Sequence, residues 1–180
     1  MYTTQSQAIS SGIQTEDGVA QYLTFMLAGE EYGVDILRVQ EIKGWNGVTP
    51  VPNMPDFILG VINLRGTVVP IVDLRKYFAM KTVPFGKTTV VIVVRVNDEV
   101  EGYRIMGMVV DAVSEVHNIS SSELKPSPDF GGNISTESIR GLATLNERMI
   151  IILDVDHLMN DGVLKKLDVT DSESANAEGQ

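Results

Sequence analysis

Cysteine is absent from this 180-residue chain, and histidine occurs only twice. The lack of cysteine excludes disulfides, thiolate metal sites and cysteine nucleophiles. Long apolar runs are also lacking: the longest, residues 90–94 and 149–153, are far shorter than the roughly 20 residues that a membrane-spanning helix needs. No lysine or arginine precedes Arg38, and no apolar stretch follows Met1. We therefore expect no secretory signal, no direct membrane insertion and a cytoplasmic location.

Positive charge is scarce, because 14 lysines and arginines face 24 aspartates and glutamates, for a net charge of −10. Such a chain does not collect phosphate backbones, which argues against nucleic-acid binding. It also lacks a basic cluster that would hold an anionic membrane. The two ends contribute acidic residues without a single base and few apolar residues, so residues 1–19 and 168–180 are predicted to be disordered tails.

The interior, residues 20–167, is rich in valine and isoleucine, which favour strands over helices. Its apolar runs are short and are separated by turn residues, a pattern typical of all-β proteins. The predicted strands are 22–28, 32–36, 47–51, 60–65, 67–73, 88–96, 103–110, 113–119, 140–145 and 148–154. Helical turns are expected at 37–43, 55–59 and 74–78, and a short C-terminal helix at 159–167 within the segment 155–167.

An internal repeat is the most informative feature of the sequence. Three blocks of the first half recur in the same order in the second half. The matching blocks are 33–42 with 107–116, 55–57 with 128–130, and 60–77 with 141–158. Three collinear matches indicate a duplication.

The duplication predicts two five-stranded barrels, because five strands can close or nearly close and so remove exposed edges. We expect a first barrel at 20–85 and a second at 86–158. Each copy is near the lower size limit for an independent core, so the two should share a third apolar interface. A groove between two such halves is a common place for binding.

The search for catalytic or metal-binding motifs finds little. Gly86-Lys87-Thr88 resembles the end of a phosphate-binding loop, but position 81, where such a loop needs glycine, is Lys81. Asp154 and His157 could suggest a metal site, yet a polar end to a strand fits better. No GxSxG nucleophile motif is present. We therefore expect no catalytic residue, no metal and no cofactor.

Apolar residues offer a different kind of site. Val39 and Ile42 are three positions apart on the predicted turn, and Val113 and Val116 occupy the equivalent places in the second copy. If helical, each pair would face one way, toward the groove between the barrels. Ordinary core packing is the alternative for at least half of these positions.

Several of these blocks resemble a known family. The family's motifs match residues 31–42, the Asn63-Leu64-Arg65-Gly66 segment within 60–66, and residues 69–74, 89–93 and 108–116. Together they resemble the CheW-like domain family of chemotaxis coupling proteins over about residues 20–167. The same domain also occurs in the kinase CheA and in CheV adaptors, but residues 168–180 leave no room for the receiver domain of a CheV protein, which favours a free-standing coupling protein.

The resemblance implies two SH3-like or OB-like barrels with strands exchanged between the repeats. It implies a non-catalytic adaptor, monomeric when free, that couples the cytoplasmic tip of chemoreceptors to the regulatory CheW-like domain of CheA in receptor arrays. An adaptor for a non-flagellar chemosensory kinase pathway is the alternative. Enzymes and nucleic-acid-binding OB proteins fit less well, because convergent polar residues and interleaved bases and aromatics are lacking.

The resemblance also implies two sets of contact residues. The receptor-facing set is Val39, Glu41, Ile42, Val90, Val113 and Val116, supported by Asn63, Arg65 and Gly66. The kinase-facing set is Lys43, Gly44, Phe57 and Gly60. Glu41 and Arg65, of opposite charge at the expected groove, are hypothesised to form an ion pair. The second copy has Asn146-Glu147 in place of Arg65-Gly66, so we expect a single receptor site.

Overall fold

The computed structural model describes residues 18–128 and 136–167. The predicted tails therefore lie almost wholly outside the described residues. Ten strands make up most of the described part. They are β1 (Val19–Leu27), β2 (Glu30–Asp35), β3 (Val39–Gly44), β4 (Ile58–Leu64), β5 (Thr67–Asp73), β6 (Val90–Asp98), β7 (Gly102–Val110), β8 (Ala112–Ser120), β9 (Ile139–Leu145) and β10 (Arg148–Leu153). The all-β prediction is confirmed.

Helical segments are few and short. They are η1 (Ile36–Arg38), α1 (Leu74–Tyr77), η2 (Ser121–Glu123), η3 (Thr136–Ser138) and η4 (His157–Val163), a wide turn inside a C-terminal helix that runs over residues 155–167. This helix begins four residues before the predicted range. Asp73 and Asp154 stand at equivalent places in the repeat, and each accepts a backbone N–H at the start of the following helix. Asp154 thus serves as the polar end of a strand, as expected.

The predicted turn at 37–43 and strand at 47–51 are wrong. Residues 39–44 form β3, which pairs with β6, whereas only Thr49 of 47–51 forms an isolated bridge, with Val61. A register shift between Val39 and Glu41 inserts an extra residue into β3. Such a bulge breaks strict alternation, and the three-residue spacing of apolar residues that it leaves resembles that of a helix.

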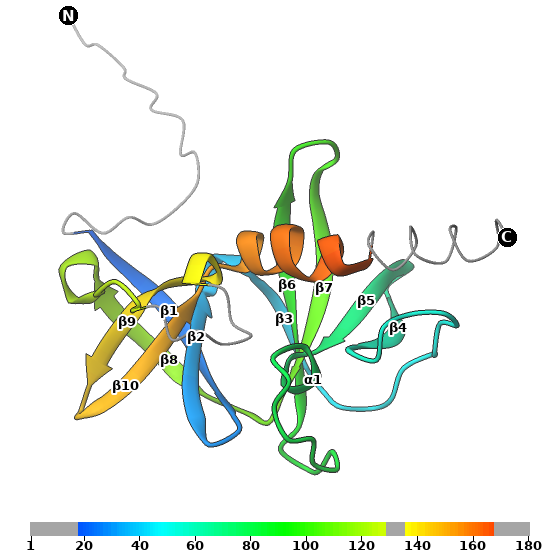
Figure 1. Cartoon of the computed structure of the whole chain (residues 1–180), viewed down its shortest axis with the longest axis horizontal. Helices are drawn as coiled ribbons and strands as arrows, with labels where there is room; N and C mark the ends of the chain where they lie inside the picture. The colour runs from blue at the N-terminus through cyan, green and yellow to red at the C-terminus, as the bar shows by residue number, and fades with distance from the viewer. Residues whose placement is uncertain (1–17, 129–135, 168–180) are drawn as a thin grey trace, which may run out of the picture.

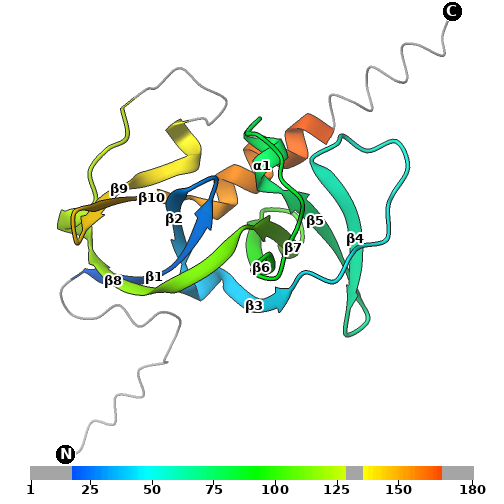
Figure 2. The same ribbon diagram turned by 90° about the horizontal axis from the view of Figure 1, so that it is seen from below.

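Two five-stranded sheets form, in the orders β8-β1-β2-β10-β9 and β3-β6-β7-β5-β4. We call them barrel 1 and barrel 2; they lie side by side in Figures 1 and 2. Equivalent strands of the repeat occupy the same place in each order, with β3 matching β8 and β5 matching β10. Each copy, however, gives its first two strands to one barrel and its last three to the other. The predicted consecutive barrels 20–85 and 86–158 therefore need correction: these ranges are repeats, and neither is a sheet by itself.

Each barrel has one isolated β-bridge between its two edges. The bridge joins a residue of one edge strand to a residue in the segment that follows the other edge strand. Thr49 and Val61 exchange two backbone hydrogen bonds of 2.9 Å, and Lys125 and Leu142 exchange an equivalent pair. Gly60, before Val61, and Gly141, before Leu142, allow the two segments to approach closely. A Cβ on Gly60, whose φ is +150°, would lie 2.2 Å from the Thr49 carbonyl oxygen.

Gly60→Ala is accordingly expected to lower the free energy of unfolding by about 2 kcal/mol or more, because the clash is with backbone that cannot move freely. Gly86→Ala is the matched control, since a methyl group there would meet no atom within 4 Å. Urea unfolding of both variants tests this. Equal midpoints for the two would show that the bridge tolerates a side chain.

Apolar side chains fill three clusters. One lies inside barrel 1 around Ile150 and Ile152, and another inside barrel 2 around Ile71 and Val93. The third and largest draws on strands of both barrels and on the C-terminal helix, with Phe25, Ile92 and Leu158 among its buried members. This shared core is the third apolar interface that the repeat predicts.

A shared core makes the two barrels one folding unit. We expect a single calorimetric transition for the full chain, in which the calorimetric and van't Hoff enthalpies agree. Two well-separated peaks would mean that each barrel is stable without the other.

Two ion pairs lie at the two connections where the chain crosses from one barrel to the other. Arg38, between β2 and β3, donates to both carboxylate oxygens of Asp156 at 2.9 and 2.6 Å. Arg75, in α1, donates to both oxygens of Asp111, between β7 and β8, at 2.7 and 2.5 Å. Burial raises the pKa of Asp111, but the hydrogen bonds from Arg75 and from the Ala28 N–H outweigh it and hold that pKa below its ordinary value.

Candidate functional site

The edge strand β3 carries the first part of the receptor-facing set. Val39 is half-buried and packs against the shared core, whereas Ile42 is 43% exposed. Glu41 is half-buried between them. Val90, the first residue of β6, lies opposite Gly44 and also borders the shared core. Val39 and Ile42 therefore do not share one face, which corrects the expectation drawn from a helical turn.

The edge strand β8 of barrel 1 repeats this arrangement. Val113, equivalent to Val39, is half-buried against the same shared core. Val116, equivalent to Ile42, is 47% exposed. The structure thus brings Val39, Val90 and Val113 to the border of one apolar cluster. Of the predicted set, Ile42 and Val116 are the residues that expose apolar surface.

The β4–β5 hairpin places Arg65 beside β3. Its two turn residues, Arg65 and Gly66, have φ values of +51° and +88°, as a two-residue turn of type I′ requires. The Asn63 Oδ1 accepts the Gly66 N–H at 2.8 Å and so braces the turn. Arg65 Nη1 then lies 3.2 Å from Glu41 Oε2. The hypothesised ion pair is present, although its geometry is not that of a hydrogen bond.

Barrel 1 has no counterpart of this ion pair among the described residues. Its equivalent hairpin turns at Asn146 and Glu147, which also have positive φ, but neither is a base. Glu115, equivalent to Glu41, lies 3.6 Å from His117 instead. A small hollow of about 140 Å³ adjoins the Arg65 turn in barrel 2, lined by Gln40, Leu64, Arg65, Thr67 and Ile105. The charged site is therefore specific to barrel 2.

The residues of the kinase-facing set lie in two different environments, one at the end of an edge strand and one buried. Lys43 and Gly44 end the edge strand β3, where Lys43 is half-buried and Gly44 exposed. Phe57 is buried in the shared core, edge-on to Tyr77 with ring centroids 5.3 Å apart. Gly60 lies under the bridge that closes barrel 2. Phe57 and Gly60 therefore present little surface, and the sequence could not show this because burial depends on the closing of the barrel.

One polar cluster was missed by sequence reasoning. Ser138 Oγ lies 3.2 Å from His157 Nδ1, and Glu137 Oε2 lies 2.8 Å from His157 Nε2. Ser138 is buried, so its hydroxyl is not open to a substrate, and the cluster ties η3 to the C-terminal helix. Its members lie about 20 residues apart in the sequence, too far for a local motif. Within residues 18–128 and 136–167, no group of His, Asp and Glu side chains could hold a metal ion.

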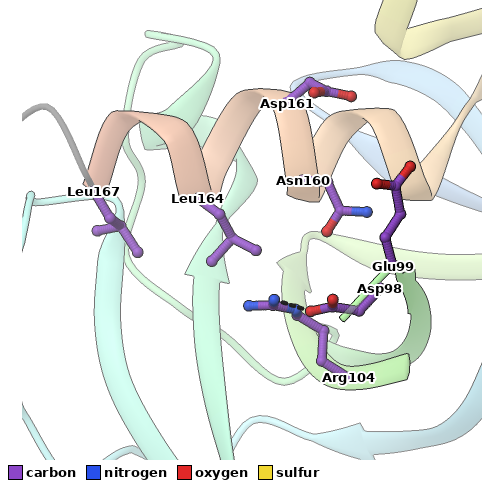
Figure 3. A pocket seen from close by; sticks show the side chains of 7 residues that line it. All are labelled: Asp98, Glu99, Arg104, Asn160, Asp161, Leu164 and Leu167. Atoms are coloured by element: carbon purple, nitrogen blue, oxygen red, sulfur yellow. Dashed lines mark hydrogen bonds and ion pairs between the residues drawn. The ribbon is translucent and has the colours of Figure 1, made fainter. Parts of the chain in front are cut away.

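A larger hollow, of about 490 Å³, opens between the β6–β7 hairpin and the C-terminal helix (Figure 3). Leu164 and Leu167 line it from the helix, and the hairpin contributes Arg104, which pairs with Asp98. Hydrogen bonds from the Val100 N–H and from Arg104 hold the pKa of Asp98 below its ordinary value. No local sequence pattern indicates this hollow, because it depends on how the helix packs against the hairpin.

No helix in the described part of the chain is long and apolar enough to cross a membrane. The site as a whole consists of exposed valine and isoleucine, one braced hairpin and one ion pair. Such surfaces suit recognition of another protein, in which apolar anchors are surrounded by polar groups.

Comparisons with known proteins agree on one family. The model of the CheW-like domain matches residues 21–163. The Chemotaxis protein CheW of Klebsiella aerogenes is 45% identical over 148 residues, which cover 82% of this chain and 86% of that protein. The Chemotaxis protein CheW of Rhizobium meliloti is 36% identical over 140 residues, 78% of this chain and 87% of that protein.

A solved structure is also similar. The scaffolding protein TtCheW from Thermoanaerobacter tengcongensis superposes with a TM-score of 0.69 at 35% identity, covering 77% of this chain and 91% of that one. The family model and these relatives span nearly all of the described residues. The chain belongs to the CheW-like domain family.

Proposed function

We propose that this chain is a non-catalytic chemotaxis adaptor that couples chemoreceptors to the histidine kinase CheA. The observation that carries the proposal is the β4–β5 hairpin, whose Arg65 pairs with Glu41 of β3, in a chain that matches the family over residues 21–163. The relatives' names, chemotaxis protein and scaffolding protein, support the same role. The adaptor would act in the cytoplasm, recruited to receptor arrays.

The receptor surface is proposed to lie along β3 and β8. Ile42 and Val116 are exposed and would contact the receptor tip directly. Val39, Val90 and Val113 would support these strands from the shared core. Glu41, with the hairpin residues Asn63, Arg65 and Gly66, would form the polar rim, since helix-in-groove recognition combines apolar anchors with such a rim.

The kinase surface is proposed to include the end of the same edge strand. Lys43 and Gly44 lie there, and edge strands offer unpaired backbone groups to a second sheet. Phe57 and Gly60 would not touch the kinase but would support the shape of this surface from beneath, because both are buried. The proposed partner is the CheW-like regulatory domain of CheA.

Co-sedimentation with receptor-containing membranes tests the proposal directly. The chain should sediment with these membranes in the absence of CheA, and CheA should sediment only when the chain is present. Receptor-free membranes are the control. Equal recovery with both kinds of membrane, or no effect on CheA, would contradict the adaptor role.

Charge reversal tests the rim of the receptor surface. Glu41→Arg and Arg65→Glu should each weaken receptor binding several-fold, and the double reversal should restore part of the loss. Because the Arg65 side chain is 75% exposed, the pair should contribute only about 0–1 kcal/mol to folding. Titration calorimetry against a receptor-tip fragment measures binding, and thermal melts measure stability. Independent, additive losses in the double variant would show that the two residues act separately.

A further inference from the structure

The two ion pairs at the crossovers have opposite polarity. At the first crossover the base, Arg38, directly precedes β3, and the acid, Asp156, belongs to the helix after β10. At the second crossover the acid, Asp111, directly precedes β8, and the base, Arg75, belongs to the helix after β5. Arg75 and Asp156 are equivalent in the repeat, so equivalent positions carry opposite charges.

Polarity matters because the repeat allows a second arrangement of the same strands. If each copy kept its own strands, β5 would lie beside β2, and β10 would lie beside β7. Arg75 would then face Arg38, and Asp156 would face Asp111. Both junctions would bring like charges together where side chains are only 13–30% exposed, and such contacts are unfavourable by several kcal/mol.

The close contact that β2 and β7 each make with a parallel neighbour is of the same type in both arrangements. Gly33 of β2 lies under the Ile152 Cδ1, where a Cβ would come within 2.7 Å. Gly107 of β7 lies under the Ile71 Cδ1 in the same way, where a Cβ would come within 2.5 Å. Without exchange, each glycine would meet the other isoleucine, so the same type of contact would form.

We infer that the opposite polarity of the Arg38–Asp156 and Arg75–Asp111 pairs selects the strand-exchanged fold over the unexchanged one. The charges supply the discrimination that the duplicated apolar pattern lacks. Each pair is bidentate, a geometry that adds specificity to its strength. Asp156 also accepts the Asn97 N–H at 2.8 Å, which anchors the acid at the end of β6 in barrel 2.

Two variants of the full chain distinguish the effect of charge polarity from the effect of losing local contacts. The one-junction variant carries Arg75→Asp with Asp111→Arg, so opposite charges meet in both arrangements and the discrimination disappears. The two-junction variant adds Arg38→Asp with Asp156→Arg, which restores like-charge repulsion in the unexchanged arrangement alone. It contains all substitutions of the first variant and is its control.

Spin labels on engineered cysteines can report the arrangement, because the chain has no cysteine of its own. Gln21 of β1 lies opposite Asn118 of β8, and all labelled positions are exposed. The repeat equivalent of Asn118 is Gly44. Labels at Gln21 and Asn118 are therefore close in the exchanged fold, whereas labels at Gln21 and Gly44 are close only in the unexchanged one.

After refolding from urea, wild type and the two-junction variant should show only the exchanged distances. The one-junction variant should populate both arrangements, so the Gln21–Gly44 distance should appear in a share of molecules comparable to that of the Gln21–Asn118 distance. The inference would be overturned if the one-junction variant refolded to the exchanged arrangement alone, as wild type does. Equal failure of both variants would also overturn it, because the substitutions themselves, and not their polarity, would then be responsible.

Discussion

Ile42→Asp is expected to lower affinity for a receptor-tip fragment by about 2–4 kcal/mol, because it places a charge in a contact that excludes water. Ile42 is exposed in the free chain, so the melting temperature should hardly change. Val39→Asp is the informative comparison. Val39 borders the shared core, and its replacement should lower both receptor affinity and thermal stability.

Titration calorimetry against the receptor tip and against the CheA regulatory domain, with thermal melts of each variant, separates these effects. Thr82→Asp, an exposed replacement in the segment between α1 and β6 and outside both proposed surfaces, serves as the charge control. For Ile42→Asp, CheA binding should fall much less than receptor binding, because the side chains of Ile42 and Lys43 point to opposite faces of β3. An equal loss of both partners from a protein that melts normally would contradict separate surfaces.

Asp111→Asn is expected to produce the largest loss of stability among polar substitutions, about 2–3 kcal/mol at pH 7. Arg75 would keep its charge, only 13% exposed, but lose its carboxylate partner. The pKa of Asp111 is lowered in the folded chain. A lowered folded-state pKa means that the carboxylate stabilises the fold fully above its unfolded-state pKa, and that this contribution is lost as pH falls through the folded-state value.

The difference between wild type and Asp111→Asn should therefore be constant from pH 7 to about pH 5 and should shrink below about pH 4. Urea unfolding at a series of pH values measures it. Asp56→Asn, at an exposed aspartate, is the matched control and should change stability little at any of these pH values. A difference that persists undiminished at pH 3 would show that packing, and not charge, explains the loss.

Local patterns predicted much of the fold because they act over a few residues. Short valine and isoleucine runs predicted most strands, and Arg65-Gly66 and Asn146-Glu147 lie at the tight turns where turn chemistry placed them. The error at β3 has a local cause too, since its bulge after Val39 imitates helical spacing. The repeat located equivalent residues, such as Val39 and Val113, before any contact was known.

Local sequence patterns could not predict the features that depend on packing between distant parts of the chain. Phe57 is apolar whether it contacts a partner or fills a core, and only the closed structure shows that it is buried. The same holds for Ser138 and His157, which meet only when η3 packs against the C-terminal helix. The Glu41–Arg65 contact was within reach because the family resemblance, and not the spacing, placed both residues at one site.

Because strands are exchanged, the two copies of the repeat are interlocked like the two subunits of a heterodimer, although they belong to one chain. The only covalent link between the two copies is the segment of residues 78–89 between α1 and β6, and β6 lies in the same barrel as β3, β4 and β5 of the first copy. A protease cut in this segment would leave two fragments, each holding strands of both barrels. The fragments should remain associated until the shared core itself unfolds, so a nicked chain would migrate as one particle in a native gel and as two bands in a denaturing one.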